Sequence, residues 1–261
     1  MAWPRPLVAG LDVLNRRGKS LGVRLVKYTG KSPHFIHPKH LVETPGHDWY
    51  LAHLAPGHAV LDVGCANGAH SLKAAARVRR VVGVDYDAGQ LDVATQTARS
   101  RGLDNIQFFP WDLTQPLPFP AEAFDAVLFL DVIEHLEARQ PVLREIRRVL
   151  TPAGKLLVSG PNRESRWRDR LRAAGLFAFQ DEDHKIEYTQ PEFVAELEVA
   201  GFALEGPLEP VVYDTPWAGL IDAIGGLSLG AYARLASWKR RRALEEPRES
   251  TGFRAVARKS A

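Results

Sequence analysis

Between Ala59 and Gly160 the sequence alternates short β-rich runs with helical patterns, and this alternation constrains the fold more than any other feature. Strands that alternate with helices form right-handed crossovers and a parallel sheet with helices on both faces. The predicted strands are Ala59–Val63, Arg80–Val84, Ile106–Phe109, Phe124–Leu130 and Lys155–Ser159. The predicted helices are 69–77, 87–101 and a segment from Pro141 to Leu150, which Thr151-Pro-Ala-Gly154 terminates. The sequence therefore predicts an α/β protein with a doubly wound, mostly parallel sheet.

The segments outside this region complete the predicted organisation. Thr189-Gln-Pro-Glu192 is a capping box that starts a helix, and Phe202–Tyr213 and Gly252–Ala257 are predicted as two closing strands. The run 215–247 is predicted as a helical insertion before the last strand. We expect residues 1–58 to form an N-terminal helical or lid segment, 59–160 a ligand-binding core, and 161–261 the substrate side of the same domain.

Composition excludes several classes of protein. With 45% hydrophobic and 25% charged residues the chain can bury a core, so it is neither disordered nor fibrous. Its single cysteine, Cys65, excludes disulfide scaffolds and thiolate zinc ribbons. The first ten residues contain two prolines and no apolar signal-peptide core, so a cytoplasmic location is expected.

The charge is distributed unevenly along the chain. Residues 1–40 carry eight Lys or Arg against one Asp, and residues 234–261 carry nine against three Glu, although the whole chain has a net charge of only +3. The middle is therefore acidic, which argues against a uniform nucleic-acid-binding face and predicts no nucleic-acid partner. The basic ends are either solvated or suited to phosphates or an anionic membrane.

A turn of small residues follows the first predicted strand. Gly64, Ala66 and Gly68 in Val60-Leu-Asp-Val-Gly-Cys-Ala-Asn-Gly68 allow a ligand to approach the backbone before a helix begins. Asp85 ends the second strand, where its carboxylate can accept both hydroxyls of a ribose. Asp112 follows the third strand and can bond an adenine amino group. Together these residues predict a nucleoside site.

Residues 59 to about 160 resemble a class I S-adenosylmethionine-dependent methyltransferase, through Val60–Gly68, the two acids, Phe124–His135 and Leu150–Lys155. The resemblance implies a seven-stranded Rossmann-like sheet whose last strand is antiparallel, and S-adenosyl-L-methionine as the cofactor. It implies that Gly64, Cys65 and Gly68 line the methionine end. From the residue type alone, we favour a packing role for Cys65 over a cofactor contact. The predicted cofactor-binding residues are Asp62, Gly64, Cys65, Ala66, Gly68, Asp85, Tyr86, Asp112, Leu113 and Leu130.

Other enzymes of related fold match the sequence less well. The loop reads G-x-A-x-G and not the G-x-G-x-x-G of nicotinamide dehydrogenases. The fourth strand ends in Asp131-Val-Ile-Glu134, which lacks the Pro-Pro-aromatic motif of DNA amino-methyltransferases. Cys65 lies in the cofactor loop, where it cannot serve as the nucleophile of a pyrimidine carbon-5 methyltransferase.

Two histidines are the predicted catalytic residues. His135 follows the fourth strand, on the sheet edge where α/β proteins bind ligands, and His184 precedes the capping box. An oxygen nucleophile must lose its proton, and histidine is suited to accept it. Asp131-x-x-Glu134-His135 also resembles the divalent-metal cluster of ubiquinone-pathway O-methyltransferases, with Asp in place of the first Glu. The prediction is that no metal is bound.

The insertion leaves three interpretations open. Its first half is nearly apolar and Arg240–Arg242 follow, so residues 215–242 are a helical lid, a dimer face or a peripheral contact with the inner face of a membrane. In the membrane interpretation Trp217, Ile221, Ile224, Leu235 and Trp238 face the bilayer. Five arginines between Arg163 and Arg172 form a second basic patch, which suggests an anionic or lipid-linked acceptor. The oligomeric state stays open.

The predicted function is S-adenosylmethionine-dependent methyl transfer, most simply to a hydroxyl of a small or lipid-linked metabolite. Weaker similarity connects the chain with quinone-pathway and cell-surface polysaccharide methyltransferases through His184-x-x-x-Tyr188-Thr189. One alternative is an RNA or protein methyltransferase that uses the basic ends. The other is a cofactor-binding regulator without catalysis, because binding residues alone do not establish turnover.

Overall fold

The computed structural model describes residues 3–44 and 46–260. Its contacts divide the chain into two compact units, which we call the sheet unit and the helical unit. The sheet unit comprises Tyr50–Pro161, Asp183–Glu209 and Phe253–Ala261, and the helical unit comprises Met1–Trp49, Asn162–Glu182 and Pro210–Gly252. The predicted boundaries at 58 and 160 stay predictions.

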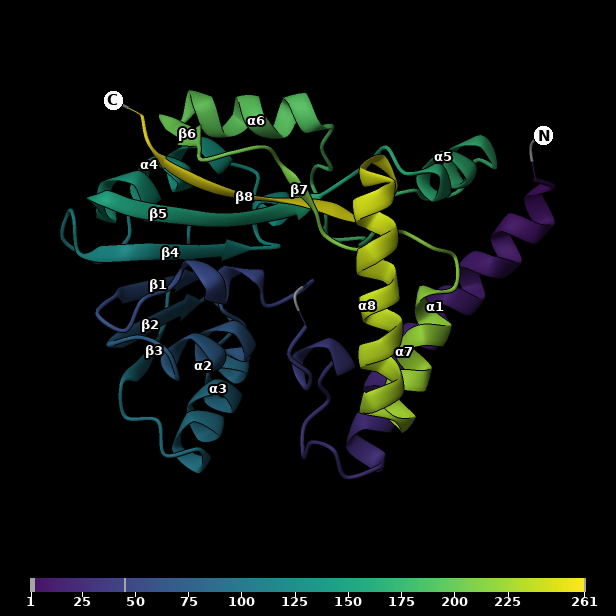
Figure 1. Cartoon of the computed structure of the whole chain (residues 1–261), viewed down its shortest axis with the longest axis horizontal. Coiled ribbons are helices and arrows are strands. Elements are labelled where there is room, and N and C mark those ends of the chain that lie inside the picture. The colour runs from purple at the N-terminus through teal and green to yellow at the C-terminus, as the bar shows by residue number, and fades with distance from the viewer. Residues whose placement is uncertain (1–2, 45, 261) are drawn as a thin grey trace. The chain divides into compact units, whose positions relative to one another are not determined.

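One sheet, which belongs almost wholly to the sheet unit, has the strand order β3-β2-β1-β4-β5-β8-β6, with β7 paired to β8 (Figure 1). Strands β1 to β5 pair in parallel, and β6 pairs with β8 in antiparallel fashion. The predicted doubly wound α/β fold is therefore confirmed. The strands are β1 (Ala59–Val63), β2 (Arg80–Asp85), β3 (Ile106–Pro110), β4 (Phe124–Leu130), β5 (Leu150–Pro161), β6 (Phe202–Leu204), β7 (Glu209–Pro210) and β8 (Gly252–Lys259).

The sheet has eight strands where seven were predicted, because the segment Phe202–Tyr213 is not one strand. It breaks after Leu204, and Gly206-Pro207 separates β6 from the two-residue β7. A proline has no N–H to donate to a ladder, and glycine favours a turn. Tyr213 forms only an isolated bridge with Ser250.

The β5 strand starts earlier than predicted. Leu150 pairs with Phe124 and Lys155 with Ala126, so the four residues of the predicted loop, 151–154, bulge out of an otherwise continuous ladder.

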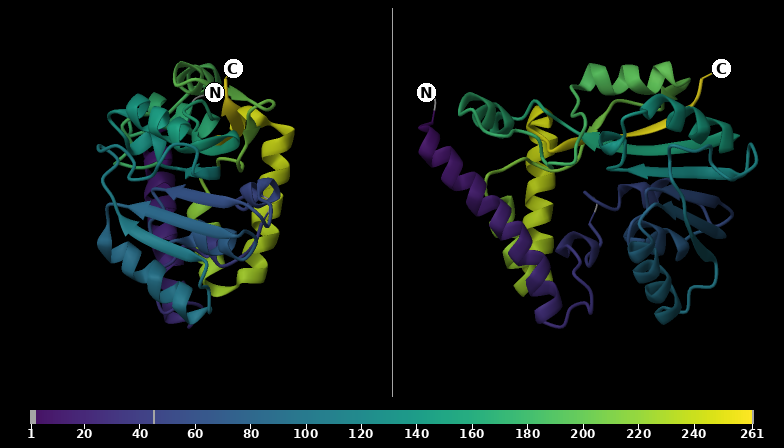
Figure 2. Two further views of the ribbon diagram at one scale, coloured as in Figure 1. Left: turned by 90° about the vertical axis from the view of Figure 1, so that its left-hand side faces the viewer. Right: turned by 180° about the vertical axis from the view of Figure 1, so that it is seen from behind.

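Helices of the sheet unit pack against the strands that come next in the chain (Figures 1 and 2). They are α2 (Ala69–Ala75), α3 (Ala88–Ser100), α4 (Arg139–Val149) and α6 (Gln190–Val199), with the short 3-10 helices η2 (Trp49–His53) and η3 (Ile133–His135). The predicted apolar face of α4 is confirmed, because Val142, Leu143, Ile146 and Val149 are buried in the core. The predicted capping box is also present: Glu192 accepts from the Thr189 backbone N–H at 2.9 Å, and the Thr189 hydroxyl accepts from Glu192 at 3.4 Å.

The helical unit contains α1 (Arg5–Tyr28), α5 (Arg166–Ala173), α7 (Ala218–Leu227) and α8 (Leu229–Glu245), with the 3-10 helices η1 (Pro38–His40) and η4 (Pro247–Glu249). The expected N-terminal helix and the helical insertion are thus observed, and a lid role for either stays a prediction. Figures 1 and 2 show α1 and α7 side by side. Among the helices of residues 3–44 and 46–260, none has the length and apolar character needed to cross a bilayer.

Candidate active site

The loop between β1 and α2 has a backbone that few residues adopt. Gly64, Ala66 and Gly68 have φ angles of +74°, +45° and +72°. A Cβ atom at position 64 would lie 2.6 Å from a methyl carbon of Val132, so this position requires glycine for space as well as for its dihedral angles. The Gly64 N–H donates to the carbonyl of Val84 at 2.8 Å, which fixes the loop at the end of β2.

Asp85 is the last residue of β2, and its carboxylate is held by the backbone. The Ala66 N–H donates to one carboxylate oxygen at 2.8 Å, and the Asp87 N–H donates to the other at 2.9 Å. A carboxylate has about four lone-pair positions, so these two bonds leave acceptor capacity for ligand hydroxyls. Asp85 therefore has the orientation and the unused hydrogen-bond acceptor positions that binding of ribose hydroxyls requires.

A pocket of about 740 Å³ lies at this edge of the sheet, wholly within the sheet unit. Its volume falls in the range of small-molecule and cofactor sites, and the carboxyl ends of parallel strands are where α/β sheets bind ligands. Seven predicted site residues line it: Gly64, Ala66, Asp85, Tyr86, Asp112, Leu113 and His135.

The remaining lining residues make the pocket acidic. Asp87, Asp131 and Asp183 add to the two predicted acids, against the single basic residue Lys185. Backbone hydrogen bonding from Thr114 lowers the pKa of the exposed Asp112, which keeps this carboxylate charged. Several carboxylates in one cleft favour a ligand that carries positive charge, such as a sulfonium with an ammonium group.

Four predicted cofactor-binding residues do not line this pocket but are buried around it: Asp62, Cys65, Gly68 and Leu130. The Ser71 hydroxyl donates to Asp62 at 2.5 Å, and burial raises the pKa of Asp62 to about 7. Burial also raises the pKa of the Cys65 thiol, whose sulfur packs against Gly83. Direct cofactor contacts by these four residues stay a prediction.

The sequence suggests Asp131 only as a metal ligand, and the structure shows that it lines the pocket. It follows β4 with a φ of +57°, a strained conformation for a residue with a side chain. The Ser159 hydroxyl stabilises this conformation, because it accepts from the Asp131 N–H at 3.0 Å and donates to its carboxylate at 2.7 Å. The position directly after a central strand was the signal that this residue lies on the pocket wall.

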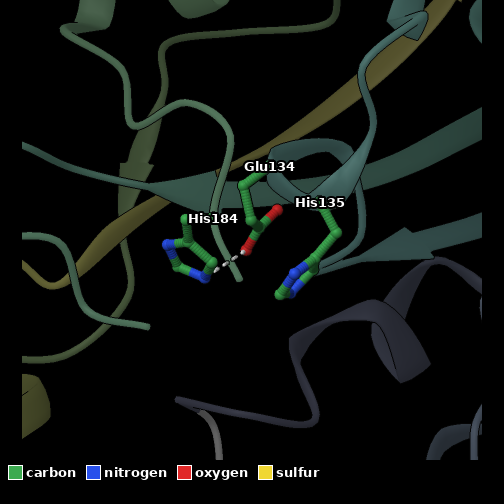
Figure 3. A group of neighbouring side chains, drawn as sticks. All are labelled: Glu134, His135 and His184. Atoms are coloured by element: carbon green, nitrogen blue, oxygen red, sulfur yellow. Dashed lines mark ion pairs between the residues drawn. The ribbon is translucent and has the colours of Figure 1, made fainter. Parts of the chain in front are cut away.

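The two predicted catalytic histidines lie together (Figure 3). Their ring centroids are 4.8 Å apart in an edge-to-face arrangement, and His135 lines the pocket. They come from distant segments, which the Lys185 N–H joins by donating to the carbonyl of Glu134 at 2.7 Å.

A buried carboxylate holds His184. The Nδ1 atom of His184 lies 2.9 Å from Glu187, whose side chain has no exposed surface, and its Nε2 atom lies 3.9 Å from Glu134. When Glu187 accepts the Nδ1 proton, the Nε2 lone pair is directed toward Glu134 and the His135 ring. Sequence reasoning missed Glu187, although its spacing of three residues from His184 was a usable signal.

This arrangement supports two kinds of chemistry. The histidines can accept a proton, or they can join Glu134 as ligands of a divalent ion, because ligand atoms of the three residues lie within 4.8 Å of one another. The cluster differs from the one in the sequence motif, since His184 takes the place of Asp131. The absence of a metal stays a prediction.

The fold and the pocket together define a doubly wound α/β protein with an acidic pocket of cofactor size at the carboxyl edge of its sheet and two histidines beside it. Residues 61–158 match the methyltransferase domain family. This region therefore belongs to the class I S-adenosylmethionine-dependent methyltransferases, and S-adenosyl-L-methionine is the cofactor that the family implies. The residues of the pocket fit that cofactor, because the buried Asp85 carboxylate is oriented by two backbone N–H groups and has acceptor positions left for ribose hydroxyls, and the acidic lining suits a sulfonium.

Curated relatives agree with this assignment, and a solved structure shares the fold. A probable S-adenosylmethionine-dependent methyltransferase of Mycolicibacterium smegmatis is 36% identical over 158 residues, which cover 60% of this chain and 57% of that protein. A 27-O-demethylrifamycin SV methyltransferase of Amycolatopsis mediterranei is 29% identical, with coverages of 67% and 65%. The chain thus spans less than two thirds of either relative. The 4+2 cyclase SpnF has the same fold, with a TM-score of 0.63 at 22% identity, covering 96% of this chain and 97% of that one.

Proposed function

We propose that this protein transfers the methyl group of S-adenosylmethionine to a hydroxyl oxygen of a small-molecule acceptor. The observation that carries the proposal is the position of His135 on the wall of the pocket that contains Asp85, beside a second histidine held by Glu187. When bound, the cofactor supplies an electrophilic methyl group on a sulfonium.

The residues of the chain provide binding and proton transfer. Asp85 accepts hydrogen bonds from ribose hydroxyls, and Asp112 is available to the adenine side. His135 accepts the hydroxyl proton of the acceptor at a ring nitrogen, and His184 is a positioning residue whose own orientation depends on Glu187. A general base of this kind contributes about 10²- to 10⁴-fold, and orientation of the reactants contributes more.

The choice of a small acceptor rests on the arginines and on a relative. The patch that suggested an anionic or lipid-linked acceptor is used largely inside the helical unit: Arg168 pairs with Asp214 at 3.1 Å, and Arg166 pairs with Glu249 at 3.2 Å. The Amycolatopsis relative is named for a small molecule that lacks a methyl group on an oxygen. Both facts support a small hydroxylated acceptor.

The test must follow the methyl group itself, because a protein of the same fold is a cyclase and fold does not determine chemistry. The purified chain is incubated with tritium-labelled S-adenosylmethionine and a bacterial cell extract, and the products are separated into aqueous small-molecule, organic and macromolecular fractions. We expect label in the small-molecule or organic fraction, and its loss with His135→Ala at unchanged cofactor binding.

The other outcomes distinguish the alternatives. Label in RNA or protein would favour a macromolecular methyltransferase, and label in the organic fraction that is carried by lipid species alone would favour a lipid-linked acceptor. No transfer despite cofactor binding would favour a regulator. Asp92→Ala, which changes an exposed acid on α3, is a matched charge control for removal of the Asp85 carboxylate.

A further inference from the structure

Helix α1 has a row of exposed apolar side chains that its packing in the helical unit does not use. Leu7, Leu14, Leu21 and Tyr28 recur every seven residues and are all exposed, Leu14 to 63%. Seven residues make almost two helical turns, so the four side chains form one stripe along α1.

Helix α7 has a matching pair. Leu220 and Leu227 are again seven residues apart, and Leu227 is 62% exposed. This pair extends the apolar surface beyond α1 only if both rows lie on the same side of the two helices.

The glycine contacts between α1 and α7 show that they do. Gly18 faces Gly219, and Gly22 faces Gly226, so the two helices run in the same direction. At about 100° per residue, Leu14 and Leu21 lie about 70° to one side of the contact line on α1, and the α7 leucines lie about 100° in the opposite rotational sense. For helices that run in the same direction, opposite rotations lead to the same side. The two rows therefore form one apolar strip, which we call the leucine face.

The charge beside the leucine face is positive. Arg17 and Arg24 lie next to the α1 row, and neither has an ion pair or a side-chain hydrogen bond among the residues that the structure describes. Each helix contains one acid, and both are used elsewhere: Asp12 pairs with Arg16 at 3.0 Å, and the buried Asp222 pairs with His37 at 3.2 Å. No acidic residue of α1 or α7 in the described chain thus neutralises these arginines.

From the exposed leucines and the two unpaired arginines we infer that the leucine face binds the surface of an anionic phospholipid membrane. Leucines enter the acyl boundary while arginines reach the phosphates. A second copy of the chain fits less well, because two such faces would bring arginines together without an acid between them. The inference does not depend on methyl transfer.

This surface differs from the one predicted from the sequence. Within residues 215–242, Ile221 is buried against Tyr232 and Ala236, and Leu235 packs on the same cluster. Arg240 bonds the carbonyl of Pro210, and Arg242 pairs with Glu245 and Glu246. Of the predicted membrane side chains, Ile221 and Leu235 are therefore used within the helical unit, whereas Trp217 and Trp238 are exposed. Helix α1 supplies the larger part of the new face, and a membrane contact through residues 215–242 stays a prediction.

Sedimentation of the full chain with lipid vesicles tests the inference. We expect binding to phosphatidylcholine vesicles that contain one third phosphatidylglycerol, little binding to pure phosphatidylcholine, and a marked loss of binding at high salt. Leu14→Gln/Leu21→Gln should reduce the partition coefficient by about tenfold or more. Leu244→Gln, an equally exposed leucine on α8, should change it little.

A second double variant tests the role of the two arginines and keeps the inference testable if the leucine double variant does not fold. Arg17→Gln/Arg24→Gln should weaken binding by about fivefold for each arginine, while Arg99→Gln/Arg144→Gln, with the same change in net charge, should not. Absence of wild-type binding, or equal effects of both arginine pairs, would overturn the inference. The inference would also be overturned if the wild type formed a stable dimer and did not bind vesicles, and if Leu14→Gln/Leu21→Gln dissociated that dimer.

Discussion

The backbone N–H of Ala66 donates a hydrogen bond of 2.8 Å to the carboxylate of Asp85, which joins the glycine loop to the end of the neighbouring strand. One side chain thus fixes the loop and presents acceptor positions to the pocket. The loop and the acid form a single unit, and the first two predictions concern its two parts.

Replacing Asp85 with alanine should weaken cofactor binding. The variant loses charge-assisted hydrogen bonds to the ribose and the anchor of the Ala66 N–H, so we expect a loss of about 1–3 kcal/mol in binding free energy. Isothermal titration with S-adenosylmethionine measures it. Asp92→Ala should bind like the wild type, and an unchanged affinity of Asp85→Ala would contradict the ribose assignment.

Gly64→Ala should destabilise the loop. The new methyl group would meet Val132 at 2.6 Å, and alanine is disfavoured at a φ of +74°. We expect a loss of about 1–3 kcal/mol in the free energy of unfolding, together with weaker cofactor binding. The control is Gly57→Ala, where a Cβ atom would meet no other atom within 4 Å. Equal urea midpoints for the two variants would show that the loop is not strained.

The histidine pair should affect turnover and not cofactor affinity. With an acceptor in hand, His135→Ala should lower kcat by about 10²- to 10⁴-fold. Glu187→Gln should lower kcat less and shift the pH profile, because it alters the orientation and basicity of His184. A fall in kcat with Glu187→Gln but no change in the pH profile would indicate that Glu187 is merely structural.

Removal of metal ions by a chelator distinguishes proton transfer from metal binding at the cluster of Glu134, His135 and His184. We expect full activity after dialysis against EDTA, because the proposal assigns the histidines to proton transfer. Loss of activity that magnesium or zinc restores would instead make these residues metal ligands.

Asp62 should make stability depend on pH. Burial raises its pKa to about 7 in the folded chain, above the ordinary value of 3.8. The contribution of Asp62 to the free energy of unfolding is therefore fully present below about pH 4. This contribution is lost, by up to about 4 kcal/mol, as the pH rises to about 7.

Urea unfolding of the cofactor-free chain at several pH values, compared with Asp62→Asn, measures this contribution. The variant retains an acceptor for Ser71 but cannot ionise. Its stability relative to the wild type should rise with pH between about 4 and 7. Parallel pH profiles for the two proteins would show that Asp62 does not ionise across this interval.

Much of the sheet unit follows from local pattern. The apolar runs at 59–63 and 124–130 are strands because they are short and are bounded by polar, proline or glycine residues that favour turns. Polar residues that end parallel strands, such as Asp85, fall at one edge of the sheet because of its topology. The break after Leu204 is due to Gly206-Pro207. The prediction of one strand gave more weight to the apolar residues on either side than to this local turn signal.

Contacts between distant segments could not be predicted in the same way. Glu187 contacts His184 locally, but His184 is brought beside Glu134 and His135 by a hydrogen bond from the Lys185 N–H to the Glu134 carbonyl, about fifty residues away in sequence. The packing of α1 on α7 joins glycines some two hundred residues apart. Periodicity shows which face of a helix is apolar, whereas only tertiary contacts show which apolar residues remain exposed.

The most direct test of the central claim is a crystal structure of the protein with S-adenosylhomocysteine. We predict electron density for the nucleoside in the pocket between the loop at Gly64 to Ala66 and the carboxylates of Asp85 and Asp112, with the ribose hydroxyls on Asp85. A ligand bound elsewhere, or an empty pocket at saturating ligand in a crystal that leaves this edge of the sheet open, would contradict the claim.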